Sequence, residues 1–244
     1  MNGFVSIMEG DFEAARDFSE RGLAVNPSHS LLLFLRTALE FYSGGLDEGA
    51  VYLDRLLEAM RLVPSGSAFE YAAVAKLLPE IALISGVTDL LDVAESAAGT
   101  VLSSPSAGLL FIMFARAGLA MAAVQRGEAL AAEEQRAALE SQPAAILILT
   151  VCDCLLGLLS ITLGDLNQAM AYFKESLAFC RKAGYRPELA WTCCDYADAL
   201  REHDAERDRA KAIALLDESL AVSSELGMRP LMERVLSRRE ILKA

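Results

Sequence analysis

Few side chains in this sequence belong to the types that catalyse reactions. The chain has 244 residues, of which two are histidines. His29 follows Pro27 and Ser28, and His203 lies in the polar stretch 201–204, so both are expected in solvated loops. A catalytic nucleophile needs an adjacent base and a third group that orients the base. No serine or cysteine stands in a sequence context that suggests such activation, so we expect no catalysis by this chain.

The cysteines do not form a metal-binding pattern. Cys152 and Cys154 are two residues apart on a predicted helix, which places their thiols about 200° apart around its axis. Cys193 and Cys194 are adjacent and diverge likewise, and no Cys-x-x-Cys pair or nearby histidine completes a zinc set. No glycine-rich turn is followed by Lys-Ser/Thr, as a phosphate-binding loop requires. We therefore expect buried cysteines, no metal and no cofactor.

The composition indicates an acidic globular protein. The chain is 54% hydrophobic and carries 34 Asp and Glu against 22 Lys and Arg, a formal net charge of -12. Its apolar content suffices for a large core, and its negative field repels nucleic acid and anionic lipid. Five cysteines, an odd number, without a cleavable signal peptide at the start favour a reducing, cytoplasmic setting.

The elements that position these side chains are predicted to be helices. Leu and Ala recur at spacings of three and four residues nearly throughout, and no stretch shows the period-two pattern of a strand. A Gly-Asp-apolar motif, or a variant of it, recurs along the chain. Copies begin at Gly10, Gly44, Gly164 and Arg207, with weaker ones at Gly86 and Gly127.

The motif, followed by Ala five residues after the glycine, resembles the tetratricopeptide repeat (TPR). In that family the small residues let two helices approach closely, and an aromatic residue fills the remaining space. The match is not uniform, since Asp153 stands where the family prefers Trp and Gly49 replaces its second-helix Ala. The positions that match the family's structural residues are Gly10, Ala15, Gly44, Leu156, Gly157, Gly164, Ala169, Phe173, Asp208 and Ala212.

The resemblance implies an all-α fold. We expect residues 1–244 to form one right-handed α-solenoid of five to six TPR-like helix hairpins. Pro79 predicts a kink or break in its helix. The predicted pairs are 29–43 with 46–61, 67–85 with 87–102, 107–126 with 128–141, 144–163 with 166–183, and 187–202 with 208–226.

The two ends of the chain predict different roles. Residues 230–243 carry Leu231 and Val235 on one face, which predicts a helix that caps the last repeat. The basic side chains of this segment are expected to contact an acidic partner or the chain's own acidic repeats. Nine residues precede Gly10, so the first helix is expected to be truncated. Residues 1–25 would then pack on upstream repeats, another subunit or another domain.

The resemblance also assigns side chains to the concave groove. On the first helix of the fifth unit these are Val151, Cys154, Leu158, Ile161 and Thr162. The groove is expected to be apolar and to accept an amphipathic helix or a hydrophobic ligand. Aromatic side chains of the last two units could line a pocket there, although packing between helices is favoured.

Two further stretches have more than one interpretation. Residues 195–211 alternate in charge, which predicts a solvated face. Residues 144–163, a run of twenty interrupted only by the charge of Asp153, are long enough to cross a membrane. Their place in the repeat favours a buried helix instead.

These patterns predict a non-catalytic protein–protein interaction scaffold. The spacing of the turns is similar to that in the TPR-like superhelical regions of bacterial signal-transduction ATPases and of maltose-activator-type transcriptional regulators. The segment 185–244, with Ala190-Trp191-Thr192 and Gly227-Met228-Arg229-Pro230 in it, resembles the C-terminal end of predicted ATPases that carry a nucleotide-cyclase or DNA-binding module elsewhere. The resemblance implies a regulatory region whose partners are a protein or other domains of a longer polypeptide, with self-association through the N-terminal end as an option. The alternatives are a small-molecule sensor that uses the groove, a membrane-associated helical protein and, last, a hydrolase that relies on carboxylates.

Overall fold

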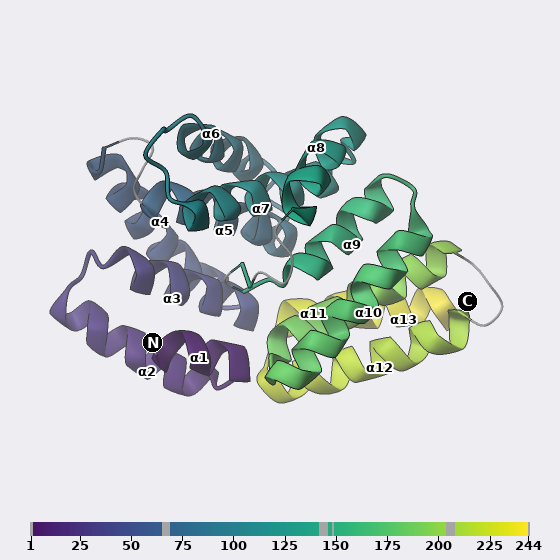
Figure 1. The fold of residues 1–244 in the computed structure, drawn as a ribbon. Coiled ribbons are helices and arrows are strands. Elements are labelled where there is room, and N and C mark those ends of the chain that lie inside the picture. The colour runs from purple at the N-terminus through teal and green to yellow at the C-terminus, as the bar shows by residue number, and fades with distance from the viewer. Residues whose placement is uncertain (1, 65–68, 142–145, 148, 204–207, 244) are drawn as a thin grey trace.

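The chain is all-α, as the sequence predicts (Figure 1). The structure is a computed structural model that describes residues 2–64, 69–141, 146–147, 149–203 and 208–243. Within these ranges the only β-type pairing is an isolated bridge between Ile146 and Val151. The helices are α1 (Asn2–Glu9), α2 (Phe12–Val25), α3 (Ser30–Ser43), α4 (Leu46–Leu62), α5 (Phe69–Ser85), α6 (Leu90–Leu102), α7 (Leu109–Arg126), α8 (Ala129–Glu140), α9 (Cys152–Thr162), α10 (Leu166–Ala183), α11 (Arg186–His203), α12 (Asp208–Leu226) and α13 (Arg229–Lys243).

Consecutive helices pack in pairs, from α1 with α2 to α11 with α12, and α13 packs on α12. We call the odd-numbered members α1 to α11 the first helices and their partners the second helices. Each first helix contacts the next one, and α11 contacts α1, so the contacts among the first helices close into a ring. The C-terminal helix α13 also contacts α3. We call α1–α8 and α9–α13 the two halves of the chain. They meet at α9 and again where α1 and α3 contact α11 and α13 (Figure 1).

The recurring Gly-Asp motif has a local structural cause. Gly10 and Gly164 lie between the helices of their pairs with φ of +83° and +77°, a region that glycine enters without steric cost. The following aspartate caps the second helix: Asp11 accepts from the Ala14 N–H at 3.0 Å, and Asp165 accepts from Gln168 at 3.1 Å. One dipeptide thus ends one helix and starts the next.

The N-terminal unit packs within this chain. Ile7 of α1 is 1% exposed, and a Cβ added to Gly10 would lie 2.5 Å from the Leu226 side chain at the end of α12. The apolar side of residues 2–25 is therefore covered in part by α12. Self-association through this end stays a prediction.

The helix predicted for residues 144–163, the first helix of the fifth unit, begins later in the structure. Residues 142–145 and 148 lie outside the described residues, but Leu149 has φ of +72° and the Leu147 N–H donates to the Thr150 carbonyl at 2.8 Å. The backbone turns here, and α9 begins only at Cys152. With 11 residues, α9 is too short to span a membrane, which removes the reason for treating 144–163 as a span. By length and composition alone, α7 could cross one, although 44% of it is buried.

Of the kink or break predicted at Pro79, the break is wrong, because α5 runs through this residue from Phe69 to Ser85. Proline cannot donate to the carbonyl four residues earlier, which belongs to Ala75. Helix α7 passes very close to that carbonyl: a Cβ added to Gly118 would lie 2.0 Å from the Ala75 oxygen. A glycine on α7 thus lets two backbones approach at the point where proline leaves an acceptor unused.

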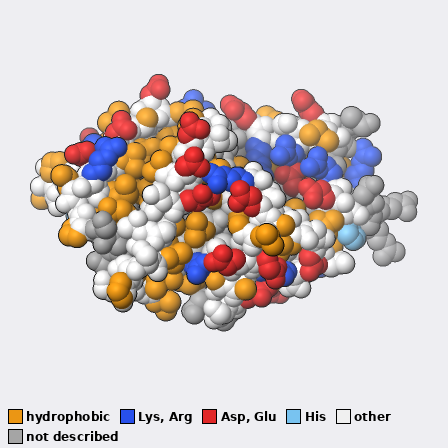
Figure 2. All heavy atoms as spheres, turned by 90° about the horizontal axis from the view of Figure 1, so that it is seen from above, with side chains coloured by type: hydrophobic (Ala, Val, Ile, Leu, Met, Phe, Trp, Pro, Cys, Tyr) orange, Lys and Arg blue, Asp and Glu red, His pale blue; other side chains and the backbone are white. Residues whose placement is uncertain are grey.

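The surface of the molecule is not uniform. Figure 2 shows one face on which apolar side chains gather toward one end, while acidic and basic side chains alternate elsewhere. Large apolar side chains that are exposed include Val51 and Leu62 of α4 and Val93 of α6. A groove of about 540 Å³, counting open solvent, lies between α4, α5 and α6 beside Met60, Tyr71 and Val93.

Candidate functional site

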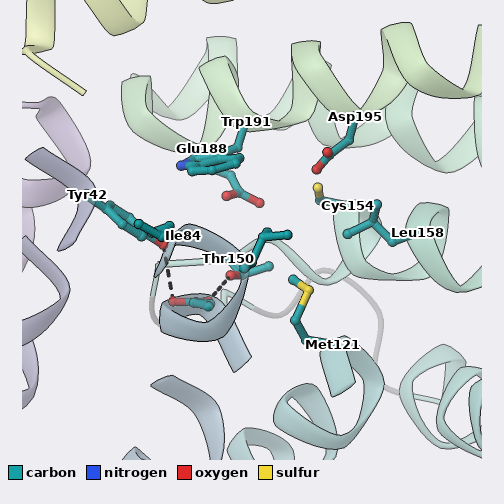
Figure 3. Close-up of a pocket in the computed structure, with 11 residues that line it drawn as sticks. Tyr42, Ile84, Met121, Thr150, Cys154, Leu158, Glu188, Trp191 and Asp195 are labelled. Atoms are coloured by element: carbon teal, nitrogen blue, oxygen red, sulfur yellow. Dashed lines mark hydrogen bonds between the residues drawn. The ribbon is translucent and has the colours of Figure 1, made fainter. Parts of the chain in front are cut away.

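A cavity lies between five first helices and the turn before α9 (Figure 3). The space inside it that admits the centre of a water-sized sphere is about 40 Å³, and its lining is mainly apolar with a few polar groups. Such a lining is typical of small-molecule sites. The lining residues are Tyr42 of α3; Glu80, Leu83 and Ile84 of α5; Met121 of α7; Thr150; Cys154 and Leu158 of α9; and Glu188, Trp191 and Asp195 of α11.

The wall formed by α5 carries a buried polar network. Lys76 and Glu80, one helical turn apart, form an ion pair, with side chains 3% and 7% exposed. Thr150 accepts from Lys76 at 3.1 Å and donates to Glu80 at 2.9 Å, while the Tyr42 hydroxyl donates to Glu80 at 3.3 Å. The turn at Leu149 therefore brings Thr150 into a network that an unbroken helix would not position.

The opposite wall, formed by α11, carries Glu188. Glu188 is 4% exposed, and its Oε1 accepts a hydrogen bond from the Val151 backbone N–H at 2.9 Å. Figure 3 shows the carboxyl group beside the Trp191 ring and turned toward the cavity. Burial raises the pKa of Glu188 to about 8; the Glu80 and Asp195 charges act in the same direction, and the Val151 N–H and Lys76 oppose them.

Asp195 corrects the prediction of a solvated charged face at 195–211. It lies on the buried side of α11, 5% exposed, and accepts from Arg234 of α13 at 2.6 Å. Arg238 of α13 likewise donates to Asp198 at 2.9 Å. The basic C-terminal segment thus contacts the chain's own acidic repeat, one of the two arrangements that its charge predicts.

The structure divides the predicted groove residues. Cys154 and Leu158 line the cavity. Val151 is 1% exposed and contributes its backbone N–H to Glu188. Ile161 and Thr162 are partly buried further along α9 and do not line the cavity, and Thr162 donates to the Leu158 carbonyl at 3.1 Å.

The predicted structural residues pack between helices. A Cβ added to Gly157 of α9 would lie 2.7 Å from the Phe173 ring of α10, so the missing side chain makes room for that ring. Phe173 and Ala169 are fully buried, and Phe173 stacks on Tyr196 of α11 with 5.6 Å between ring centroids. Among the other matching positions, those buried are Ala15, Leu156 and Ala212; Gly44 is a left-handed cap, and Asp208 begins α12.

The histidines lie away from the cavity, and the cysteines are buried. His29 is exposed at the start of α3, and His203 ends α11 with its Nδ1 2.6 Å from Asp208. All five cysteines are buried free thiols. Burial raises the pKa of Cys154, the thiol at the cavity, well above its usual value, which disfavours the nucleophilic thiolate. Over the described residues, no group of three His, Cys, Asp or Glu side chains is arranged to hold a metal ion.

Sequence reasoning missed the cavity's polar groups. Glu80 and Glu188 stand in helical sequence where a carboxylate is normally solvent-exposed. A usable signal existed for Glu80. Lys76 precedes it by one turn within a run of apolar residues, a setting in which neither charge has a polar face to occupy.

No family model matches the chain, and no curated protein matches it. The proposals below therefore depend on the chain's own geometry.

Proposed function

We propose that this chain is a non-catalytic binding protein that holds a small molecule between its first helices. The observation that carries the proposal is the cavity lined by α3, α5, α7, α9 and α11. Its apolar lining and few convergent polar side chains fit a ligand that is both enclosed and oriented. The same odd-numbered helices would form the concave side of a TPR-like right-handed superhelix, which is the architecture we propose for the six pairs.

The cavity's position supports a regulatory role. A ligand in it would contact α3 and α5 from the N-terminal half and α9 and α11 from the C-terminal half. A molecule that binds only when both halves are in contact stabilises the closed ring by mass action. We propose that a protein partner, or other domains of a longer signalling or transcription-control polypeptide, respond to this change.

The test blocks the cavity with one substitution. Leu158→Trp fills the space beside α9, and Leu130→Trp places the same side chain on α8 where the residue is 91% exposed. A library of small molecules is screened by thermal unfolding and ligand-observed NMR. Compounds that raise Tm in wild type and in Leu130→Trp but not in Leu158→Trp support the proposal. Compounds that bind all three proteins equally, or no binding compound at all, contradict it.

A second candidate is docking of an amphipathic helix from a protein partner, favoured by the groove between α4, α5 and α6. Val93, 41% exposed at this groove, offers an apolar contact. Val93→Asp should weaken such a complex, and Leu158→Trp should leave it unchanged. The reverse pattern would assign binding to the cavity.

A further inference from the structure

The cavity contains one more carboxyl group than the fold neutralises. Glu80 is paired with Lys76, and Asp195 is paired with Arg234. Glu188 has no such cation: among the described residues its hydrogen-bond partner is the Val151 backbone N–H. A buried carboxylate without a counter-ion is costly, and the cost is relieved either by protonation or by a cation that arrives from outside.

Lys76 is close enough for its charge to act on Glu188, but it is already paired with Glu80. The other titratable side chains near Glu188 do not supply a cation. Burial raises the pKa of Tyr42 and Tyr185 and of the thiols of Cys154 and Cys180, so all four are neutral near pH 7. Tyr185 precedes α11, and its hydroxyl is buried without a hydrogen-bond partner among the described residues. It is close enough to Glu188 and Glu80 for their charges to act on it.

The remaining lining suits an apolar body. Ile84, Met121 and Leu158 face the space from three different helices, and the rings of Tyr42 and Trp191, with centroids 6.4 Å apart, border it. Aromatic rings beside a carboxylate are favourable surroundings for an organic cation. A bare metal ion would find no set of three ligands here in the described part of the chain.

We propose that the cavity ligand is a small organic cation, an aliphatic ammonium whose charged end binds Glu188 and whose hydrocarbon part lies among Ile84, Met121 and Leu158. This inference rests on the proposed function, because it names the class of molecule for the same cavity. The ammonium donates hydrogen bonds to the Glu188 carboxylate, and the hydrocarbon part displaces water from the apolar lining.

The test compares two probes of nearly equal shape. 3-Methylbutylamine carries the ammonium, and 3-methylbutan-1-ol is its neutral counterpart. Both are titrated by calorimetry into wild type, Glu188→Gln and Leu158→Trp. The amide introduced by Glu188→Gln keeps an oxygen that can accept from Val151, so this variant retains the local fold. We expect the amine to bind wild type and to bind Glu188→Gln about tenfold to a hundredfold more weakly, while the alcohol binds these two proteins equally.

The experiment distinguishes a failure of the cation proposal from a failure of the proposed cavity function. If the alcohol binds wild type as well as the amine does, and Leu158→Trp abolishes both, the cation proposal is overturned and the cavity function survives. If neither probe binds and the library screen finds cavity ligands that are neutral or anionic, the result is the same. If neither probe binds and the screen finds no cavity ligand, both proposals fail.

The pH dependence of amine binding shows whether the Glu188 carboxylate itself binds the ammonium, because a purely structural role of Glu188 would not make the affinity depend on pH. Because the pKa of Glu188 is about 8 in the free protein, binding of an ammonium to its ionised form releases a proton below that pH. Amine affinity should rise about tenfold per pH unit between pH 6 and 7 in wild type and stay flat in Glu188→Gln. Titration in two buffers of different ionisation enthalpy counts the proton. A wild-type affinity that stays flat between pH 6 and 7, with no proton released, would mean that the ammonium binds without an ionised Glu188 and would overturn the proposal.

Discussion

Helices α5 and α10 bury their residues in different ways. In α5, a first helix, eleven consecutive residues from Ala72 to Ala82 are buried, Lys76 and Glu80 among them. In α10, a second helix, the buried residues are Ala169, Phe173, Ser176, Leu177 and Cys180, a single stripe at helical spacing. The first helix is enclosed on all sides, whereas the second has one packed face and one face in solvent.

The same division holds for buried charge. Over the described residues, the charged side chains that are buried all lie on the three first helices α3, α5 and α11; they are Arg36, Glu40, Lys76, Glu80, Glu188 and Asp195. Buried polar groups on the second helices are uncharged: serines and one glutamine, such as Ser176 and Gln135. Polar chemistry is therefore concentrated where the helices face one another across the ring.

The largest expected effect comes from leaving a charge unpaired on a first helix. Lys76→Met keeps the volume but removes the cation beside Glu80, so we expect a loss of about 3–5 kcal/mol in the free energy of unfolding at pH 7. Lys76→Met/Glu80→Gln should recover most of it. The amide that replaces the Glu80 carboxylate carries no charge, its oxygen can accept from Thr150, and its NH2 group can donate to the Tyr42 hydroxyl oxygen. Urea unfolding of the three proteins measures both values.

The matched control is an ion pair between second helices. Arg181 of α10 and Glu218 of α12 are 2.6 Å apart, with side chains 51% and 34% exposed. Arg181→Met should change stability by less than about 1 kcal/mol, because solvent screens an exposed pair. Equal effects of Lys76→Met and Arg181→Met would show that the proposed contrast between first and second helices is wrong.

A smaller effect is expected from the backbone contact between α5 and α7. Gly118→Ala places a Cβ against the Ala75 carbonyl and should cost about 3 kcal/mol, since neither backbone can move without separating two first helices. Gly99→Ala on α6 meets nothing within 4 Å and should instead stabilise the protein by up to about 1 kcal/mol through helix propensity. Thermal unfolding checks the sign of each. A tolerated Gly118→Ala would mean that α5 and α7 are not held at this distance.

Helices of both kinds could be predicted from sequence. The predicted bounds of the first helices α3 and α11, like those of most second helices, lie within one residue of the observed ones. The predicted ranges for α4 and α10 differ from the observed ones by at most one residue, and the Gly-Asp motif located the turns at Gly10 and Gly164. Even a departure from the TPR pattern has a packing reason: a Cβ added to Gly49 would lie 2.8 Å from the Phe41 ring, which fills the place of the usual alanine.

The candidate site could not be predicted in the same way. Its polar groups come from helices distant in sequence, and the pairing of Lys76 with Thr150 joins residues 74 positions apart. The turn at Leu149 interrupts an apolar run that has helical periodicity, and no Gly or Pro among the described residues marks it. The spacing of residues within one helix also cannot show that α11 contacts α1, because closure of the ring depends on the sum of the angles between six successive helix pairs.

The smallest expected effect tests that closure. Arg229 at the start of α13 donates from Nε to the Ser43 carbonyl at 3.2 Å and from Nη2 to the Gly44 carbonyl at 2.8 Å. These carbonyls end α3, where the helix dipole is negative and the backbone acceptors lack helical partners. Because the contact is exposed, Arg229→Ala should lower stability by about 0.5–1.5 kcal/mol.

Arg239→Ala is the control, since Arg239 binds Asp217 of the adjacent α12 at 2.7 Å and its loss leaves the ends of the ring in contact. The two variants should differ most in native-state hydrogen exchange. Arg229→Ala should speed exchange at the end of α3 as well as in α13, because the segments it joins lie on opposite sides of the closure. Arg239→Ala should affect α12 and α13 alone. Unchanged exchange at α3 in Arg229→Ala would mean that the packing of α1 on α11 closes the ring without this contact.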